Sequence, residues 1–129
     1  MRVAALDLAT TTGIAIGAPG EVPECRTEVL GEPKFRGAAL LRVVSTLIRE
    51  SAPDEIVIEA PMLVQNRKHS ADTLRVLLGL VEIARAVAAT YRIPSEEIRV
   101  ATVRKHFLGF NPPARDAKRL VVNRCRALG

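Results

Sequence analysis

Aromatic side chains are scarce in this chain of 129 residues: they make up 3% of it, and tryptophan is absent. This scarcity argues against a protein that binds single-stranded nucleic acid by stacking bases on aromatic platforms. Only two cysteines occur, Cys25 and Cys125, and they lie too far apart to form a metal-binding motif. The sequence also has no signal peptide, long apolar span, repeat or low-complexity tract. We therefore expect a cytoplasmic protein with ordinary thiols.

The apolar content, 48% of the residues, predicts one globular domain over residues 1–129. Nineteen Lys and Arg against fourteen Asp and Glu give a formal net charge of +5, which favours a polyanionic partner without proving one. The excess is local, because eight basic residues and a single acid, Asp116, lie between Arg99 and the end of the sequence. The distribution of the basic residues is therefore lopsided along the sequence.

One acid closes the first apolar run of the sequence. Asp7 follows the apolar residues 3–6 and precedes a threonine-rich stretch and a second apolar run, residues 13–17. This pattern predicts a β-hairpin with Asp7 near its turn. A carboxylate there suits a ligand of a hard divalent cation, because the sheet holds it rigidly while one side stays open to substrate. It equally suits a residue that only caps the turn.

A second acid, Glu59, ends the apolar stretch at residues 55–59, which predicts a strand buried on both faces. Pro61 then stops the strand. A carboxylate that follows three apolar residues needs a partner, and a strand-end glutamate by itself more often forms a salt bridge than binds a metal. Because Asp7 lies at an equivalent strand end, the two acids together favour a shared site.

The other apolar patterns alternate between strand and helix. We expect a polar strand at residues 24–30, an amphipathic helix at 35–51 and a helix capped by Ser70 that continues to about residue 91. A last strand at 97–101, a short helical turn at 102–109 and a helix from Ala114 follow. The basic side of that last helix is positioned to meet phosphates, although a solvated helix face has the same pattern.

The helix over residues 70–91 has two apolar faces. One face consists of Leu74, Leu77, Leu78 and Val81, and the other of Val76, Leu80, Ile83 and Val87. We interpret the second face as a dimer contact, with coverage by the protein's own helices as the alternative.

The order β-β-β-α-β-α-β-α, with acids ending the first and fourth strands, resembles the ribonuclease H-like superfamily, and within it the RuvC-like Holliday junction resolvases of phage and prophage type. The stretches that carry the resemblance are Leu6-Asp7-Leu8-Ala9-Thr10-Thr11-Thr12-Gly13, Ile58-Glu59-Ala60-Pro61, and residues 103–109 with Lys118 in the following helix. The resemblance implies an α/β fold with a mixed five-stranded sheet and helices on both faces.

The resemblance also implies a function. It is that of a metal-dependent endonuclease that resolves four-way DNA junctions by phosphodiester hydrolysis, with Asp7 and Glu59 as catalytic ligands of Mg²⁺ or Mn²⁺. A symmetric homodimer acting on branched DNA, without a nucleotide cofactor or a membrane, is implied as well. The expected DNA-binding residues are Thr10, Thr11, Arg67, Lys68, Arg104, Lys105, Arg115, Lys118 and Arg119.

The sequence departs from this family in its acidic residues. The family completes its site with one or two further aspartates on a helix that would follow residue 129, and Asp116 lies too early on a basic helix to replace them. The chain is then shortened, has an incomplete metal site, or takes a third acid from a partner. A catalytically incomplete DNA-binding or interaction protein on the same fold is therefore the main alternative. Actin-like ATPases and sugar kinases share the opening pattern but need two such domains.

Overall fold

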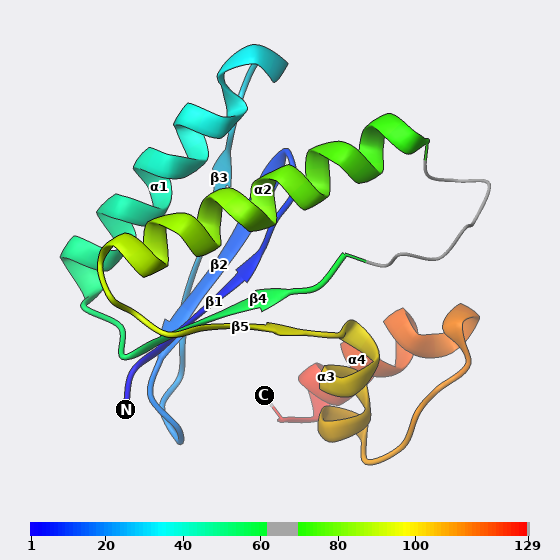
Figure 1. The fold of residues 1–129 in the computed structure, drawn as a ribbon. Helices are drawn as coiled ribbons and strands as arrows, with labels where there is room; N and C mark the ends of the chain where they lie inside the picture. The colour runs from blue at the N-terminus through cyan, green and yellow to red at the C-terminus, as the bar shows by residue number, and fades with distance from the viewer. Residues whose placement is uncertain (62–69, 129) are drawn as a thin grey trace. The chain divides into compact units, whose positions relative to one another are not determined.

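The structure is a computed structural model that describes residues 1–61 and 70–128. The chain divides into two units, residues 1–97 and residues 98–129. Within its described residues, the first unit holds a five-stranded sheet with two long helices, and the second holds two shorter helices (Figure 1). Each unit is described by itself below.

The sheet has the strand order β3-β2-β1-β4-β5. Its strands are β1 (Val3–Asp7), β2 (Thr11–Gly17), β3 (Glu24–Val29), β4 (Glu55–Glu59) and β5 (Ser95–Ile98). The first three strands run antiparallel to their sequence neighbours, whereas β1 and β4 are parallel. A parallel pair needs a crossover, which α1 (Arg36–Ser51) supplies between β3 and β4. The expected mixed five-stranded sheet is confirmed.

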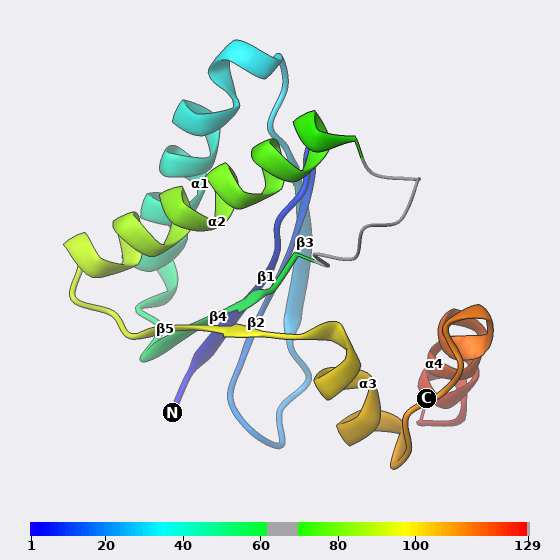
Figure 2. The ribbon, with the colours of Figure 1, turned by 45° about the vertical axis from the view of Figure 1, so that its right-hand side comes forward.

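One face of the sheet forms the core of the first unit. Alternation along the strands places Leu6, Ile14 and Ile58 on the face that α1 and α2 (Ala71–Thr90) cover (Figures 1 and 2). The buried residues that these helices contribute are Leu40, Val44, Leu47 and Ile48 from α1 and Leu80, Val81, Ala84, Val87 and Ala88 from α2. Burying these apolar side chains is the main source of the unit's stability.

The opposite face of the sheet is open within the first unit. Ala5 is exposed on it, and Val57 is only half-buried. The expectation that the strand at residues 55–59 is buried on both faces is therefore wrong. An uninterrupted apolar run predicts burial but does not distinguish a strand covered by helices on one side from one covered on two.

The last strand begins and ends earlier than its sequence pattern predicts. It was expected at residues 97–101, but β5 spans Ser95–Ile98, and α3 (Val100–Leu108) already includes Val100. Pairing with β4 already begins at Pro94, whose carbonyl accepts a hydrogen bond from the Ile56 amide at 2.9 Å. Arg99, still extended, then starts the helix, which is longer than the predicted turn.

Helix α2 is covered along part of its length. Its buried residues begin at Leu80, in the middle of the helix, and come from both predicted apolar faces. Of the face interpreted as a dimer contact, Leu80 and Val87 are buried in the core and Ile83 packs against it, so the protein's own core covers most of that face. In the first half, Val76 and Leu78 are 37% and 43% exposed. The Ser70 cap is confirmed, because its hydroxyl accepts a hydrogen bond from the Thr73 amide at 3.2 Å.

The second unit consists of α3 and α4 (Ala114–Leu128). Ala117 is buried and Val121 half-buried, whereas Cys125 and Leu128 are exposed, so the apolar side of α4 packs only over its first half within this unit. Both cysteines are free thiols, as expected. Across the part of the chain that the structure describes, none of the helices has the length and apolarity needed to cross a membrane.

Candidate active site

The two predicted acids end two neighbouring parallel strands. Asp7 is the last residue of β1 and Glu59 the last residue of β4. Leu6 lies opposite Ile58, so the next step along both strands brings Asp7 opposite Glu59. Neighbouring strands are about 4.8 Å apart, and both acids are exposed on the open face of the sheet. Two carboxylates from distant parts of the sequence therefore lie side by side where these two inner strands end.

Space beside Asp7 is kept free by a glycine. Gly13 of β2 pairs with Asp7, and a β-carbon placed on Gly13 would lie 3.5 Å from the β-carbon of Asp7. No other heavy atom outside its immediate chain neighbours would lie within 4 Å of it. The Asp7 carboxylate is thus open towards β2, with room for a ligand that a larger residue at this position would occupy.

The turn that follows Asp7 is fixed by hydrogen bonds. The hydroxyl of Thr12, which is fully buried, donates to the Ala9 carbonyl at 2.8 Å. The Leu30 amide donates to the Thr10 carbonyl at 2.9 Å, which ties the turn to the end of β3. Thr10 and Thr11 remain exposed, as a contact with phosphate requires. Thr11 and Thr12 lie in β2, although they were assigned to the turn from the sequence.

The two acids fit a hard divalent cation. Mg²⁺ is usually held by one or two carboxylates together with water and substrate phosphate oxygens. Asp7 and Glu59 supply such a pair of exposed carboxylates at the ends of two adjacent strands. Within residues 1–61 and 70–128, no group of three or more His, Cys, Asp or Glu forms a metal site. The donor set therefore suits a metal that takes most of its ligands from water or substrate.

Asp116, which was not expected to be a metal ligand, is engaged by the arginines of its own helix. Its Oδ1 lies 3.2 Å from a terminal nitrogen of Arg119, and its Oδ2 lies 3.7 Å from Nε of Arg115. These contacts offset its charge on α4.

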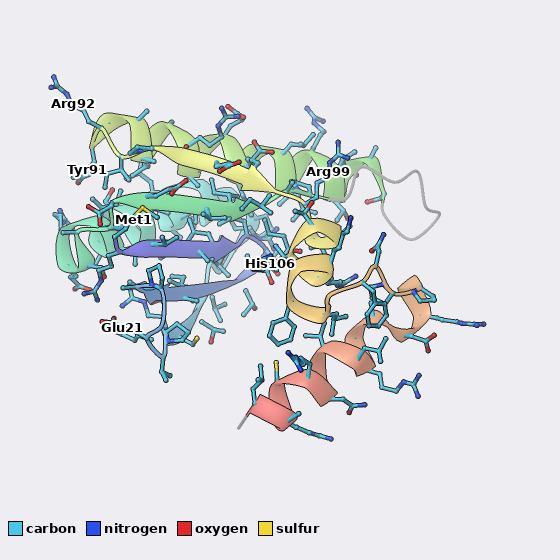
Figure 3. The ribbon with its side chains drawn as sticks, turned by 90° about the horizontal axis from the view of Figure 1, so that it is seen from below. Met1, Glu21, Tyr91, Arg92, Arg99 and His106 are labelled. Atoms are coloured by element: carbon cyan, nitrogen blue, oxygen red, sulfur yellow. The ribbon has the colours of Figure 1, made fainter. Side chains whose placement is uncertain are left out.

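The predicted DNA-binding cations fall into three groups. Arg104 and Lys105 lie on α3, near His106 (Figure 3), and Arg115, Lys118 and Arg119 lie on α4. All are exposed except Arg104, which is half-buried. Arg67 and Lys68 lie outside the described residues. The structure brings Asp7, Glu59, Thr10 and Thr11 together in the first unit, and the α3 and α4 cations belong to the second.

A groove of about 390 Å³ lies on the first unit without including either acid. Its lining consists of small and apolar residues together with Glu21, which Figure 3 labels. The lining residues are Val3, Ala5, Ala15, Gly17, Ala18, Pro19, Gly20, Glu21 and Pro23. The groove therefore lies beside the start of β1, at the other end of that strand from Asp7.

The fold is shared with known junction-resolving nucleases. RuvC from Thermus thermophilus in complex with a Holliday junction substrate superposes with a TM-score of 0.76 at 17% identity, over 99% of this chain and 79% of that one. A second structure of Thermus thermophilus RuvC superposes with a TM-score of 0.70 at 17% identity, over 95% of this chain and 78% of that one. The yeast mitochondrial Holliday junction resolvase Ydc2 superposes with a TM-score of 0.68 at 13% identity, over 95% of this chain and 61% of that one.

The sequence itself matches no family model and no curated protein. At 13–17% identity, the structural likeness establishes the fold. The expected ribonuclease H-like architecture is confirmed, and the chain resembles RuvC resolvases in structure. The phage or prophage type remains a prediction.

Proposed function

We propose that this chain is a divalent-metal-dependent DNA endonuclease that resolves four-way junctions by phosphodiester hydrolysis. The observation that carries the proposal is the pairing of Asp7 and Glu59 at adjacent strand ends. The acids lie at the ends of these strands, on the open face of the sheet, in a fold shared with Holliday junction resolvases.

The two carboxylates would hold Mg²⁺ or Mn²⁺, and such an ion supplies an activated water and stabilises the leaving oxygen of a phosphodiester. The chain's own contribution is geometric. β1 and β4 hold the two acids in register, and Gly13 leaves room beside Asp7 for a phosphate. Because both acids are exposed at the ends of their strands, a bulky branched DNA can approach them.

DNA binding in this proposal depends on the exposed threonines of the first turn and on the cations of α3 and α4. Arg104, Lys105, Arg115, Lys118 and Arg119 would neutralise backbone phosphates, a role that carries no sequence preference. Arg67 and Lys68, between Glu59 and Ser70 in the sequence, are proposed for the same role.

The proposal includes a symmetric homodimer, because resolving a junction requires two cuts on opposed strands. The exposed apolar residues Val76 and Leu78, on different sides of the first half of α2, support it, since each leaves apolar area uncovered that a second copy of the chain would bury.

A catalytically incomplete DNA-binding protein on the same fold is the second candidate. The observation that favours it is that the described residues contain no group of three metal-ligating side chains. Such a protein would still bind branched DNA through its cations, because phosphate contacts do not need the acids.

Nicking of a labelled synthetic four-way junction, compared with a linear duplex of the same length, separates the two candidates. We expect Mn²⁺-dependent paired nicks on opposed strands of the junction, lost when EDTA removes the metal. Tight junction binding without cleavage at saturating Mn²⁺ would contradict the enzyme and support the binding protein. Unpaired single nicks would contradict the dimer.

A further inference from the structure

The acid pair belongs to a longer row of residues across the sheet. Gly13 pairs with Asp7 on one side and with Thr27 of β3 on the other. Because partners in register project to the same face of a sheet, Glu59, Asp7, Gly13 and Thr27 follow one another across four adjacent strands on the open face. The row connects the acids to an edge strand of the sheet.

Thr27 ends the row with an exposed hydroxyl. Two strand spacings place its α-carbon about 10 Å from that of Asp7. No described residue forms a hydrogen bond with the Thr27 side chain. Its neighbour Arg26 projects to the opposite face, where a terminal nitrogen lies 3.7 Å from Glu50 of α1. Thr27 is thus a polar group turned to the open face.

Between Asp7 and Thr27, the surface of the sheet is formed by the backbone of Gly13. A β-carbon there would contact only the β-carbon of Asp7, at 3.5 Å, so the space above this position is open. Gly13 has no left-handed backbone angle that would require a glycine. Neither a turn nor a steric clash therefore accounts for the glycine, whereas passage of a bulky ligand close to the backbone does.

We propose that Gly13 and Thr27 mark the path of the DNA strand on the protein: the backbone passes from the acid pair over Gly13, and Thr27 donates a hydrogen bond to a phosphate oxygen. This inference rests on the proposed DNA-processing function. A hydroxyl can donate to phosphate, and a span of about 10 Å is longer than one nucleotide step, so Thr27 would contact a phosphate other than the one being cut.

The variant Gly13→Val tests the path. Valine is favoured in strands and its backbone angles are allowed here, so the thermal unfolding midpoint is expected to stay unchanged or to rise. Affinity for a labelled four-way junction, measured in Ca²⁺, is expected to fall about tenfold or more because the side chain fills the space over the row. The matched control is Ala15→Val, two residues along the same strand and face, for which wild-type affinity is expected.

The variant Thr27→Val tests the hydroxyl without adding bulk. We expect about tenfold weaker junction binding, the loss typical of one hydrogen bond to a charged group, and recovery of most of it in Thr27→Ser. Thr90→Val, which removes an exposed hydroxyl at the end of α2, serves as the control and is expected to bind as wild type.

The outcomes distinguish this inference from the function on which it rests. If the wild-type protein neither binds nor cuts the junction, the proposed function is overturned. If the wild-type protein binds and both Gly13→Val and Thr27→Val bind equally well, the function stands and the path is overturned. A stable Gly13→Val with impaired binding supports the path, because a structural role for the glycine would instead lower stability.

Discussion

The hydroxyl of Thr12 shows how single side chains prepare the site. Thr12 is fully buried one residue before Gly13, and its hydrogen bond to the Ala9 carbonyl closes the turn that follows Asp7. Its side chain is fully buried, and its hydroxyl satisfies a backbone carbonyl. The turn is thereby held in one conformation without a glycine or proline, and the exposed Thr10 and Thr11 keep their side chains available to ligands.

Replacing Thr12 by valine keeps the shape of the side chain and leaves the Ala9 carbonyl without its partner. We expect the free energy of unfolding to fall by about 1–3 kcal/mol, the cost of an unsatisfied buried polar group. Urea denaturation followed by circular dichroism measures it. Thr11→Val, on an exposed neighbour, is expected to change stability by less than about 0.5 kcal/mol. Equal stabilities of the two variants would show that the hydrogen bond does not hold the turn.

The sequence was sufficient to place Asp7 and Glu59 at strand ends, because an acid after an apolar run can be recognised locally. It did not identify Gly13 or Thr27 as their neighbours. Cross-strand register depends on the length of two connections, and no short pattern in the sequence records it. A glycine inside a strand pattern was the one available signal, since it often marks a close approach of another molecule.

At the scale of elements, α4 separates its two kinds of side chain. Ala117 packs, whereas Arg115, Lys118 and Arg119 are exposed, and Asp116 holds two of these cations close to its own carboxylate. Lys118, unlike Arg115 and Arg119, has no ion pair among the described residues, so its charge is not offset by Asp116. A contact with a phosphate would therefore cost Lys118 no existing partner.

Lys118→Ala is expected to weaken binding of junctions and linear duplexes to a similar extent, because phosphate contacts carry no sequence or branch preference. The slope of log affinity against log salt concentration should fall by about 0.9, the value for one phosphate contact on duplex DNA. Fluorescence anisotropy across a salt series measures it. Arg42→Ala, on an exposed position of α1, is the control and should leave the slope unchanged. An unchanged slope in Lys118→Ala would remove α4 from the interface.

At the scale of the whole molecule, the order of elements and the mixed sheet were predictable because hydrophobic periodicity and acids that follow apolar runs can be recognised locally in the sequence. The end of β5 was not predictable, since the pairing of Pro94 with Ile56 shifts the strand towards its start. Which residues of α2 are buried was not predictable either, because this burial depends on where α1 packs against α2. Both errors concern partners that lie far away in the sequence.

The two acids are the feature on which the whole account depends. They come from β1 and β4, are separated in the sequence by β2, β3 and α1, and meet only because β1 and β4 are parallel neighbours. Glu55 offers a matched control, because it begins β4 on the same face and lies four residues from Glu59.

The most direct measurement is the rate of junction cleavage in Mn²⁺ by Asp7→Asn and Glu59→Gln, at protein concentrations that saturate binding. Loss of a ligand to a catalytic metal removes several kcal/mol of transition-state stabilisation, so each variant should cut about a thousandfold more slowly while binding the junction as wild type. Glu55→Gln should cut at the wild-type rate. Wild-type cleavage by either acid variant would contradict a shared metal site, and loss of binding together with cleavage would show that the acid is structural.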